Sequence, residues 1–281
     1  MKHLKIGYLQ QHNVADVKTN MQRLADGVRD LAKRGAELVV LQELHNSLYF
    51  CQVEDVDNFD LAEPIPGPST DFYGALAREC NVVIVTSLFE RRAPGLYHNT
   101  AVVMERDGSI AGKYRKMHMF DIDVEGGQYY SESSVITAGD EVCVVETEFG
   151  PIGVAICYDV RFPELFRLLA KRGAKAVVMP ASFNRTTGPA HWELLMRARA
   201  LDQEMYVLGC AAAGDLAGSY NGWGHSIAVD PWGSIMEELG EGPNMLMAAV
   251  DFAKEDAVRS QIPVLQKLRT DIYEVCEKTV G

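Results

Sequence analysis

The sequence contains a thiol, a carboxylate and an ammonium group, each close to an apolar segment that could hold it in place. Cys157 follows the run Ile152–Ile156, and Pro163 stands where a helix after that turn could begin. A cysteine between a strand and a helix is held rigidly, with backbone N–H groups nearby that can bind an anion. This pattern favours Cys157 as a nucleophile, although a small buried hydrophobic residue would show the same local pattern.

The carboxylate, Glu43, follows the short apolar run Val39–Leu41. Charged side chains rarely occupy such a position without partners. Burial would raise the pKa of this carboxyl, which suits it to take a proton from a thiol and return it to a departing amine. The alternative is a surface glutamate in a loop.

The ammonium group, Lys116, ends a basic stretch that begins at Lys113. Three cations in four residues usually form a solvated face. Here, however, the semi-apolar residues 117–120 follow, which is unlike an exposed tail. An ammonium fixed opposite a developing oxyanion stabilises charge that exists only in the transition state, so Lys116 is a candidate for that role.

The segments around these groups predict an α/β fold, because apolar runs of four to seven residues alternate with longer amphipathic ones. Residues 16–34 show helical spacing, and Gly35 is a natural stop for that helix. Ser69 is expected to cap the next helix. We also expect helices at 162–172 and 190–203, and strands at 4–9, 38–41, 81–88, 100–104, 110–114, 152–156, 175–179 and 206–210.

The two halves of the chain share short repeated motifs. Leu31–Ala36 and Leu169–Ala174 have the same six letters, each before an apolar segment that contains Val-Val. Asp107–Ile110 and Trp232–Ile235 share Gly-Ser-Ile in the same order along the chain. Two repeats in matching contexts suggest an internal pseudo-twofold duplication. Strands this apolar need cover on both faces, which predicts a four-layer αββα sandwich of two sheets with outer helices.

Bulk composition narrows the classes of function. The formal net charge is −12, so the chain repels phosphate backbones and anionic lipids, and no nucleic acid or membrane partner is expected. The first residues lack a signal core and no apolar run approaches the roughly 18–20 residues that span a bilayer, which predicts a cytoplasmic protein. Six scattered cysteines without a CxxC pair predict free thiols, and dispersed histidines predict no metal site. At this length we expect one domain over residues 1–281.

Taken together, Glu43, Lys116 in Tyr-Arg-Lys-x-His and Cys157 in Ile-Cys-Tyr-Asp resemble the Glu-Lys-Cys triad of the nitrilase superfamily, in the order of that family. The similarity covers nearly the whole chain. Within the superfamily the chain is most similar to the omega-amidase branch. This resemblance rests on Phe120-Asp-Ile-Asp-Val124, on the run from Phe183 through Thr186-Thr-Gly-Pro-Ala-His-Trp-Glu193, and on Gln261-Ile-Pro-Val264.

The resemblance implies an amidohydrolase with an αββα fold, without a metal or an organic cofactor. It further implies a second glutamate near the site, for which Glu132 stands at the matching place, and a thioester intermediate on Cys157. The backbone N–H of Tyr158 would join Lys116 in binding the oxyanion. Residues 120–132, with Gly126–Gly127 as a hinge, would act as a lid.

An omega-amidase likeness implies small dicarboxylic monoamides as substrates, of the 2-oxoglutaramate or 2-oxosuccinamate type. Their free carboxylate needs a cation or hydroxyl groups, for which we expect Arg161, Tyr49 and Thr187, and Phe183 is also expected to contact the substrate. Deaminated-glutathione amidase and N-carbamoyl amide hydrolase use the same triad and stay open as alternatives.

Two alternatives from other classes are weaker. A papain-like peptidase would need His191 or His225 beside Cys157, and a non-enzymatic scaffold would have no use for all three triad residues. The helix expected at 162–172 carries Leu165, Phe166, Leu168 and Leu169, more apolar surface than one core face needs, which predicts a homodimer.

Overall fold

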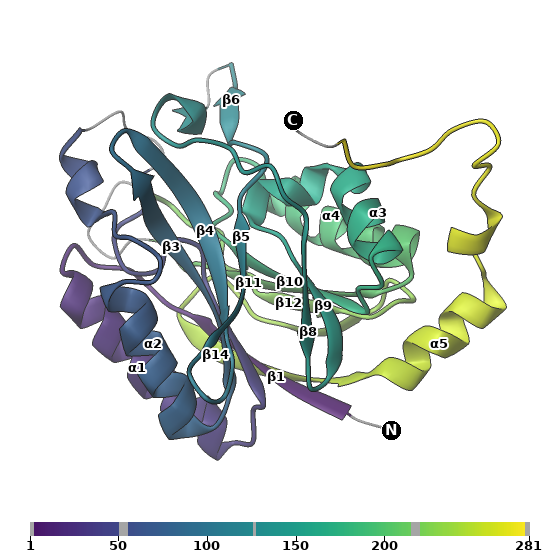
Figure 1. Ribbon diagram of the computed structural model, residues 1–281, viewed down its shortest axis with the longest axis horizontal. Helices are drawn as coiled ribbons and strands as arrows, with labels where there is room; N and C mark the ends of the chain where they lie inside the picture. Colours follow the sequence, from purple (N-terminus) through teal and green to yellow (C-terminus); the bar gives the residue numbers. More distant parts are fainter. Residues whose placement is uncertain (1–2, 51–55, 126–127, 215–219, 279–281) are drawn as a thin grey trace.

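The computed structural model describes residues 3–50, 56–125, 128–214 and 220–278. Two six-stranded sheets pack face to face between pairs of helices, which confirms the predicted four-layer sandwich (Figure 1). The first sheet contains, in spatial order, β14 (Asn244–Asp251), β1 (His3–Gln10), β2 (Leu38–Leu41), β3 (Val83–Ala93), β4 (Leu96–Met104) and β5 (Ile110–Arg115). The second contains β13 (Ile235–Glu238), β12 (Ile227–Val229), β11 (Tyr206–Ala211), β10 (Ala176–Ala181), β9 (Gly150–Val154) and β8 (Cys143–Thr147).

Helices α1 (Val17–Lys33) and α2 (Pro68–Cys80) cover the outer face of the first sheet, and α3 (Pro163–Lys171) and α4 (Gly188–Gln203) cover the second. Helix α5 (Phe252–Gln261) leads into residues 262–278, termed here the C-terminal arm. The arm returns along α3, where Lys171 pairs with Glu274 at 2.9 Å. A short hairpin of β6 (Asp121–Asp123) and β7 (Tyr129–Ser131) lies apart from both sheets.

Side-chain alternation along the strands builds the layers. In β2, Leu38 and Val40 belong to the central core between the sheets, whereas Val39 and Leu41 pack under α1 and α2. All four side chains are fully buried. A strand that is apolar on both faces is expected where one face meets a second sheet and the other meets helices, so this continuous apolar run follows from its place in the fold.

The topology is duplicated, as the repeated motifs predicted. β1, β2 and β3 are parallel neighbours followed by antiparallel β4 and β5, and the series from β9 to β13 has the same pattern. The repeated glycines have the same left-handed backbone, with φ of +93° at Gly35 and +87° at Gly173, and +81° at Gly108 and +78° at Gly233. Glycine adopts this conformation without the steric cost that a side chain would add.

One expected cap is wrong. Ser69 lies inside α2, and the N-cap is Gly67, whose N–H donates to the hydroxyl of Thr70 at 2.8 Å. Pro68 takes the first helical position, where its missing N–H costs nothing. Helices α1, α3 and α4 and the predicted strands, β1 to β5 and β9 to β11, begin and end within a few residues of their predicted limits, except that β3 extends to Ala93 and β4 starts at Leu96. Strands β6 to β8 and β12 to β14 and helix α5 were not predicted.

The expectation that α3 exposes excess apolar surface is also wrong. Leu165, Phe166 and Leu169 are buried, and Leu168 packs against the same core. None of the helices in the described residues is both long and apolar enough to cross a bilayer.

Candidate active site

Glu43, Lys116 and Cys157 converge where the two sheets meet. Lys116 Nζ donates to Glu43 Oε1 at 3.0 Å, and neither side chain is exposed. Cys157 is 5% exposed, and its Sγ accepts from the backbone N–H of Ser182 at 3.5 Å. The Glu43 carboxyl and the Cys157 thiol are close enough to shift each other's pKa. The three groups therefore share one buried environment.

Cys157 lies at a sharp turn between β9 and α3. It begins a 3₁₀ helix, Cys157–Arg161, and its φ is +44°, in the left-handed region that residues other than glycine rarely adopt. Such a conformation costs about 1–3 kcal/mol and persists only where the surroundings hold it. The turn places the thiol at the end of the strand, and Pro163 opens α3 as the sequence predicted.

Glu43 lies in a turn of similar kind after β2. The next residue, Leu44, has φ of +48°, and the N–H of Glu43 donates across to Ala181 O of β10 at 3.3 Å. This bond joins the ends of the two sheets at the site. Glu43 Oε2 accepts no hydrogen bond from a nitrogen or hydroxyl donor in the described part of the chain, and the Cys157 thiol interacts with this carboxyl, so Glu43 is placed to take the thiol proton.

Glu132 lies against Lys116, at the place that the family likeness implied. Lys116 Nζ donates to both of its carboxylate oxygens, at 3.0 and 2.8 Å, and the backbone N–H of Phe120 donates to Glu132 Oε2 at 2.6 Å. Glu132 is fully buried and opens a short 3₁₀ helix, Glu132–Ser134. The ammonium is thus fixed between two carboxylates.

The electrostatics suit a proton transfer from thiol to carboxyl. Burial raises the pKa of Glu43, and Lys116 offsets part of that rise, while the charge of Glu132 adds to it. Burial also raises the pKa of Cys157, followed by the charge of Glu43. The raised pKa of Cys157 keeps its thiol protonated, so the thiol needs a base at the moment of attack. The raised pKa of Glu43 makes its carboxylate a stronger base than an exposed glutamate, and Glu43 is placed to be that base.

Two polar residues that support Glu43 were missed by sequence reasoning. Asn99 Nδ2 donates to Glu43 Oε1 at 2.8 Å, and Ser87 Oγ donates to Asn99 Oδ1 at 3.1 Å. Both are fully buried in β3 and β4. Their only sequence signal is a polar side chain within an otherwise apolar strand.

A small cavity of about 10 Å³ opens beside the thiol. Four of the five predicted substrate contacts line it, Tyr158, Arg161, Phe183 and Thr187, together with Phe120, Ser182 and Asn184. The guanidinium of Arg161 lies over the rings of Tyr158 and Phe183, at 5.4 and 5.5 Å. Tyr49 instead packs against Tyr220 in a neighbouring aromatic cluster, with ring centroids 4.3 Å apart, and is not among the lining residues.

Asn184 is a further residue that the sequence analysis did not single out as a contact. Its Oδ1 accepts from the N–H groups of Thr186 and Thr187 and from the Thr187 hydroxyl. These three donors fix the amide orientation, so Nδ2 must point the other way. Nδ2 is buried and has no partner among the described residues, and the same is true of Ser182 Oγ. Both residues line the cavity at Cys157, so a bound molecule can satisfy them.

The two histidines of the peptidase alternative lie elsewhere. His191 Nδ1 contacts Arg161 Nη1 at 3.1 Å, and His225 Nδ1 contacts Glu238 at 3.2 Å. The imidazole that a papain-like site requires beside the thiol is absent from the residues that contact Cys157 in the described chain. No cluster of three or more potential metal-ligating His, Cys, Asp or Glu side chains occurs in the ranges that the structure covers.

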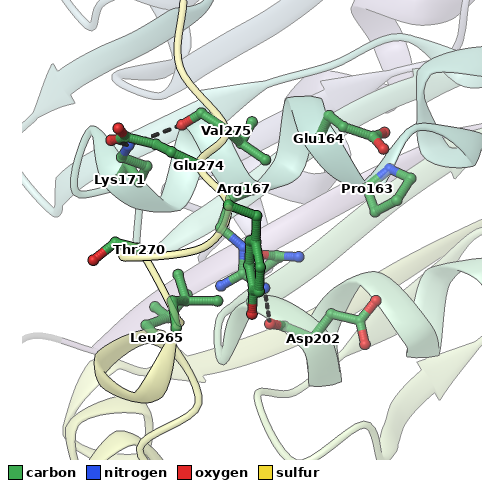
Figure 2. Close-up of a pocket in the computed structure, with 12 residues that line it drawn as sticks. Pro163, Glu164, Arg167, Lys171, Asp202, Leu265, Thr270, Glu274 and Val275 are labelled. Atoms are coloured by element: carbon green, nitrogen blue, oxygen red, sulfur yellow. Dashed lines mark hydrogen bonds and ion pairs between the residues drawn. The ribbon is translucent and has the colours of Figure 1, made fainter.

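A wider cavity, of about 400 Å³, lies between α3, the end of α4 and the C-terminal arm. Figure 2 shows Lys171 reaching Glu274 and Val275 of the arm, and Arg167 beside Asp202. Its lining includes three carboxylates and two cations but no nucleophile with a base. The cavity at Cys157 therefore remains the candidate active site in spite of its smaller volume.

The comparisons with known proteins agree with this geometry. The family model described as carbon-nitrogen hydrolase matches residues 5–260. The chain is 40% identical to the omega-amidase NIT2 of Xenopus tropicalis and 41% identical to that of Mus musculus, covering 96% of this chain and 97% of each relative.

Two solved structures are similar over nearly their whole length. A carbon-nitrogen hydrolase from Helicobacter pylori G27 has a TM-score of 0.89 at 32% identity, covering 97% of both chains. Nit3 of Saccharomyces cerevisiae, a member of branch 10 of the nitrilase superfamily, has a TM-score of 0.85 at 34% identity, covering 95% of this chain and 97% of Nit3. The chain thus belongs to the carbon-nitrogen hydrolase family of the nitrilase superfamily and is an amide-hydrolysing enzyme.

Proposed function

We propose that this enzyme is an omega-amidase that releases ammonia from small dicarboxylic monoamides of the 2-oxoglutaramate or 2-oxosuccinamate type. The observation that carries the proposal is the buried contact of Lys116 with Glu43 at 3.0 Å, in the same environment as the Cys157 thiol. The omega-amidase names of relatives about 40% identical support the choice of substrate class.

The proposed reaction has two stages. Glu43 takes the proton of the Cys157 thiol, and the thiolate attacks the amide carbon. Lys116 Nζ and the N–H of Tyr158 bind the oxyanion. When the intermediate collapses, Glu43 gives its proton to the departing nitrogen, which leaves as ammonia, and a thioester remains. Water, deprotonated by Glu43, then attacks the thioester, so that the carboxylic acid is released and the thiol regains its proton.

Cavity chemistry supports a substrate with a second, anionic end. Arg161 supplies the cation, and the Asn184 amide and the Ser182 hydroxyl supply buried groups without partners. Thr187 lies beside them, whereas Tyr49 is the least supported of the proposed contacts.

The present volume of about 10 Å³ holds roughly one water molecule, so the lining must move before a monoamide can enter. Phe120, which lines the cavity, begins the 120–132 segment that we propose as a lid. The suggested hinge at Gly126–Gly127 lies outside the described residues.

Ammonia release from a panel of amides tests the proposal. The panel contains 2-oxoglutaramate, succinamate, deaminated glutathione and N-carbamoylputrescine. We expect release from the first two only, and its loss in Cys157→Ser. Cys210→Ser is the matched control, because Cys210 is also a fully buried free thiol but lies within β11. Hydrolysis of deaminated glutathione alone, or carbon dioxide release with ammonia, would reassign the substrate. Unchanged turnover in Cys157→Ser would refute the mechanism.

We also propose a homodimer, now on different residues from those first expected. Leu194 and Leu201 of α4 are 67% and 52% exposed, so the described residues leave most of both side chains uncovered. Leu194 and Leu201 are seven residues apart, so they lie on the same face of α4, where a second copy of the chain could cover both. Analytical ultracentrifugation should show a species of twice 31.1 kDa, and a monomer alone would exclude the dimer. The cytoplasmic location stays a prediction from the sequence.

A further inference from the structure

One buried carboxylate connects the segment of Lys116 to the turn of Cys157. Asp159 Oδ2 accepts from the hydroxyl of Tyr114 at 2.8 Å and from the N–H of Ile156 at 2.8 Å. Its Oδ1 contacts His118 twice, at 3.2 Å from the backbone N–H and at 2.7 Å from Nδ1. Asp159 itself is fully buried, and it makes no contact with the small cavity.

On one side, these bonds enclose the nucleophile. The Asp159 carboxylate binds the N–H of Ile156, and the N–H of Asp159 donates back to Ile156 O at 3.0 Å. Cys157 lies between these two residues with its φ of +44°. A strained backbone of this kind persists only where its neighbours hold it, and the two bonds of Asp159 are placed to do so.

The other bonds of Asp159 hold the residues on either side of Lys116 in the sequence. Tyr114 lies two residues before Lys116 and His118 two residues after it. The Tyr114 hydroxyl also accepts from the N–H of Met117 at 3.3 Å. The His118 ring stacks on Phe162, with centroids 3.6 Å apart and planes 6° from parallel, so its position is fixed by the segment that follows Cys157.

We infer that Asp159 is a positioning residue for amide hydrolysis, which acts through Tyr114 and His118 to set the distance between the Lys116 ammonium and the Cys157 thiol. This inference rests on the proposed roles of those two groups. Lys116 follows β5 of the first sheet and Cys157 follows β9 of the second, and Asp159 ties the end of β5 to the turn after β9. A displacement of about 1 Å in such a pair can cost roughly 10²-fold in rate.

The test compares two matched tyrosine variants. Tyr114→Phe removes one hydroxyl from Asp159. Tyr206→Phe removes a hydroxyl from an equally buried tyrosine, which donates to Asp251 O at 2.8 Å far along the second sheet. We expect Tyr114→Phe to lower kcat about 10-fold or more with KM little changed, because substrate contacts remain intact. Tyr206→Phe should leave kcat within about twofold.

A second readout does not depend on the substrate. The rate at which iodoacetamide alkylates Cys157, followed by peptide mass spectrometry, should fall in Tyr114→Phe and fall further in Asp159→Asn. If Asp159→Asn does not fold, His118→Gln takes its place, since it removes the Nδ1 contact and the ring stacking on Phe162 but keeps the bond from the backbone N–H to Asp159.

Equal kcat in wild type and Tyr114→Phe, or equal losses in the two tyrosine variants, would overturn the positioning role. A wild-type protein that hydrolyses none of the amides would instead contradict the proposed substrate class. In that case the alkylation rates still decide the role of Asp159: unchanged rates in Tyr114→Phe and Asp159→Asn refute it.

Discussion

Replacement of Lys116 by methionine tests whether the buried charges converge as described. The side chain has nearly the same length, so the change removes a positive charge and leaves the packing close to intact. In the wild type, one ammonium lies 3.0 Å from Glu43 and 2.8 Å from Glu132. In Lys116→Met the two carboxylates face each other without a cation.

The expected loss of stability follows from these distances. At an effective dielectric constant of about 20, two unit charges 3 Å apart attract by roughly 5–6 kcal/mol, from which the cost of burying the ammonium must be subtracted. Removal of one partner from a buried ion pair usually costs about 3–5 kcal/mol. We expect Lys116→Met to lose about that much stability near pH 8, together with its amidase activity.

The loss of stability in Lys116→Met should increase with pH. Lys116 lowers the pKa of Glu43, so its removal allows burial to raise that pKa further. A carboxyl with a higher pKa in the folded than in the unfolded state stabilises the fold at low pH, and this contribution is lost as pH rises through the folded-state pKa. The deficit of Lys116→Met should therefore be small near pH 5 and grow towards pH 8.

Urea unfolding followed by circular dichroism measures the free energy of unfolding of Lys116→Met and of wild type at pH 5 and at pH 8. Adding Glu132→Gln should recover part of the stability of Lys116→Met, because it removes one of the two carboxylates. Lys113→Met is the control, since Lys113 lies on β5, which ends just before Lys116, and pairs with Glu90 at 3.1 Å but is partly exposed. If Lys116→Met is as stable as the control at pH 8, or if its deficit is the same at both pH values, the buried triad is not formed as described.

Two further predictions concern other parts of the molecule. Burial raises the pKa of Glu255 to about 8, so the stability that its neutral form contributes is lost as pH rises from about 4.5 to 8. We therefore expect Glu255→Gln to be more stable than wild type by roughly 1–4 kcal/mol near pH 9. Near pH 5 the two proteins should have similar stability. Urea unfolding of Glu255→Gln and wild type at pH 5 and pH 9 measures this difference in stability. Glu193→Gln is the control, because Glu193 forms the same (i,i+4) pair with an arginine on an exposed helix face. A difference between Glu255→Gln and wild type that does not change with pH would contradict the prediction. Asn184→Asp keeps an oxygen that accepts from Thr186 and Thr187 but replaces the unpartnered Nδ2 donor at the cavity by an acceptor. It should raise KM for 2-oxoglutaramate about 10-fold with a smaller change in kcat, and an unchanged KM would show that Nδ2 does not contact the substrate.

The scaffold was predictable because its signals are local. The apolar run at β2 and the helical spacing of α1 each specify one element, and the repeated hexapeptide indicated the duplication. Cys157 and Glu43 could be identified because each stands at the point where an apolar strand turns polar. These features need no knowledge of contacts between distant segments.

The remaining features depend on contacts that the sequence does not encode locally. Asn99 lies 56 positions from Glu43, and its bond to that carboxylate has no spacing signal. Ser69 was predicted as the N-cap because a hydroxyl side chain is preferred at that position. The structure instead follows Pro68, which takes the first helical position and so makes Gly67 the N-cap. Tyr49, which is close to Glu43 in sequence, was predicted to contact the substrate, but its ring packs against Tyr220.

The bond between Glu43 and Ala181 has a consequence for how this site could have arisen. Counted from the leucine that opens each copy of the hexapeptide, Ala181 holds the place in the second half that Glu43 holds in the first. A backbone hydrogen bond thus joins the two matching positions of the two halves. A glutamate at position 181 would add a negative charge near Lys116, which already lies between the carboxylates of Glu43 and Glu132. An ancestor with identical halves could supply this architecture, but a single working centre required the two copies to become unequal at this very position.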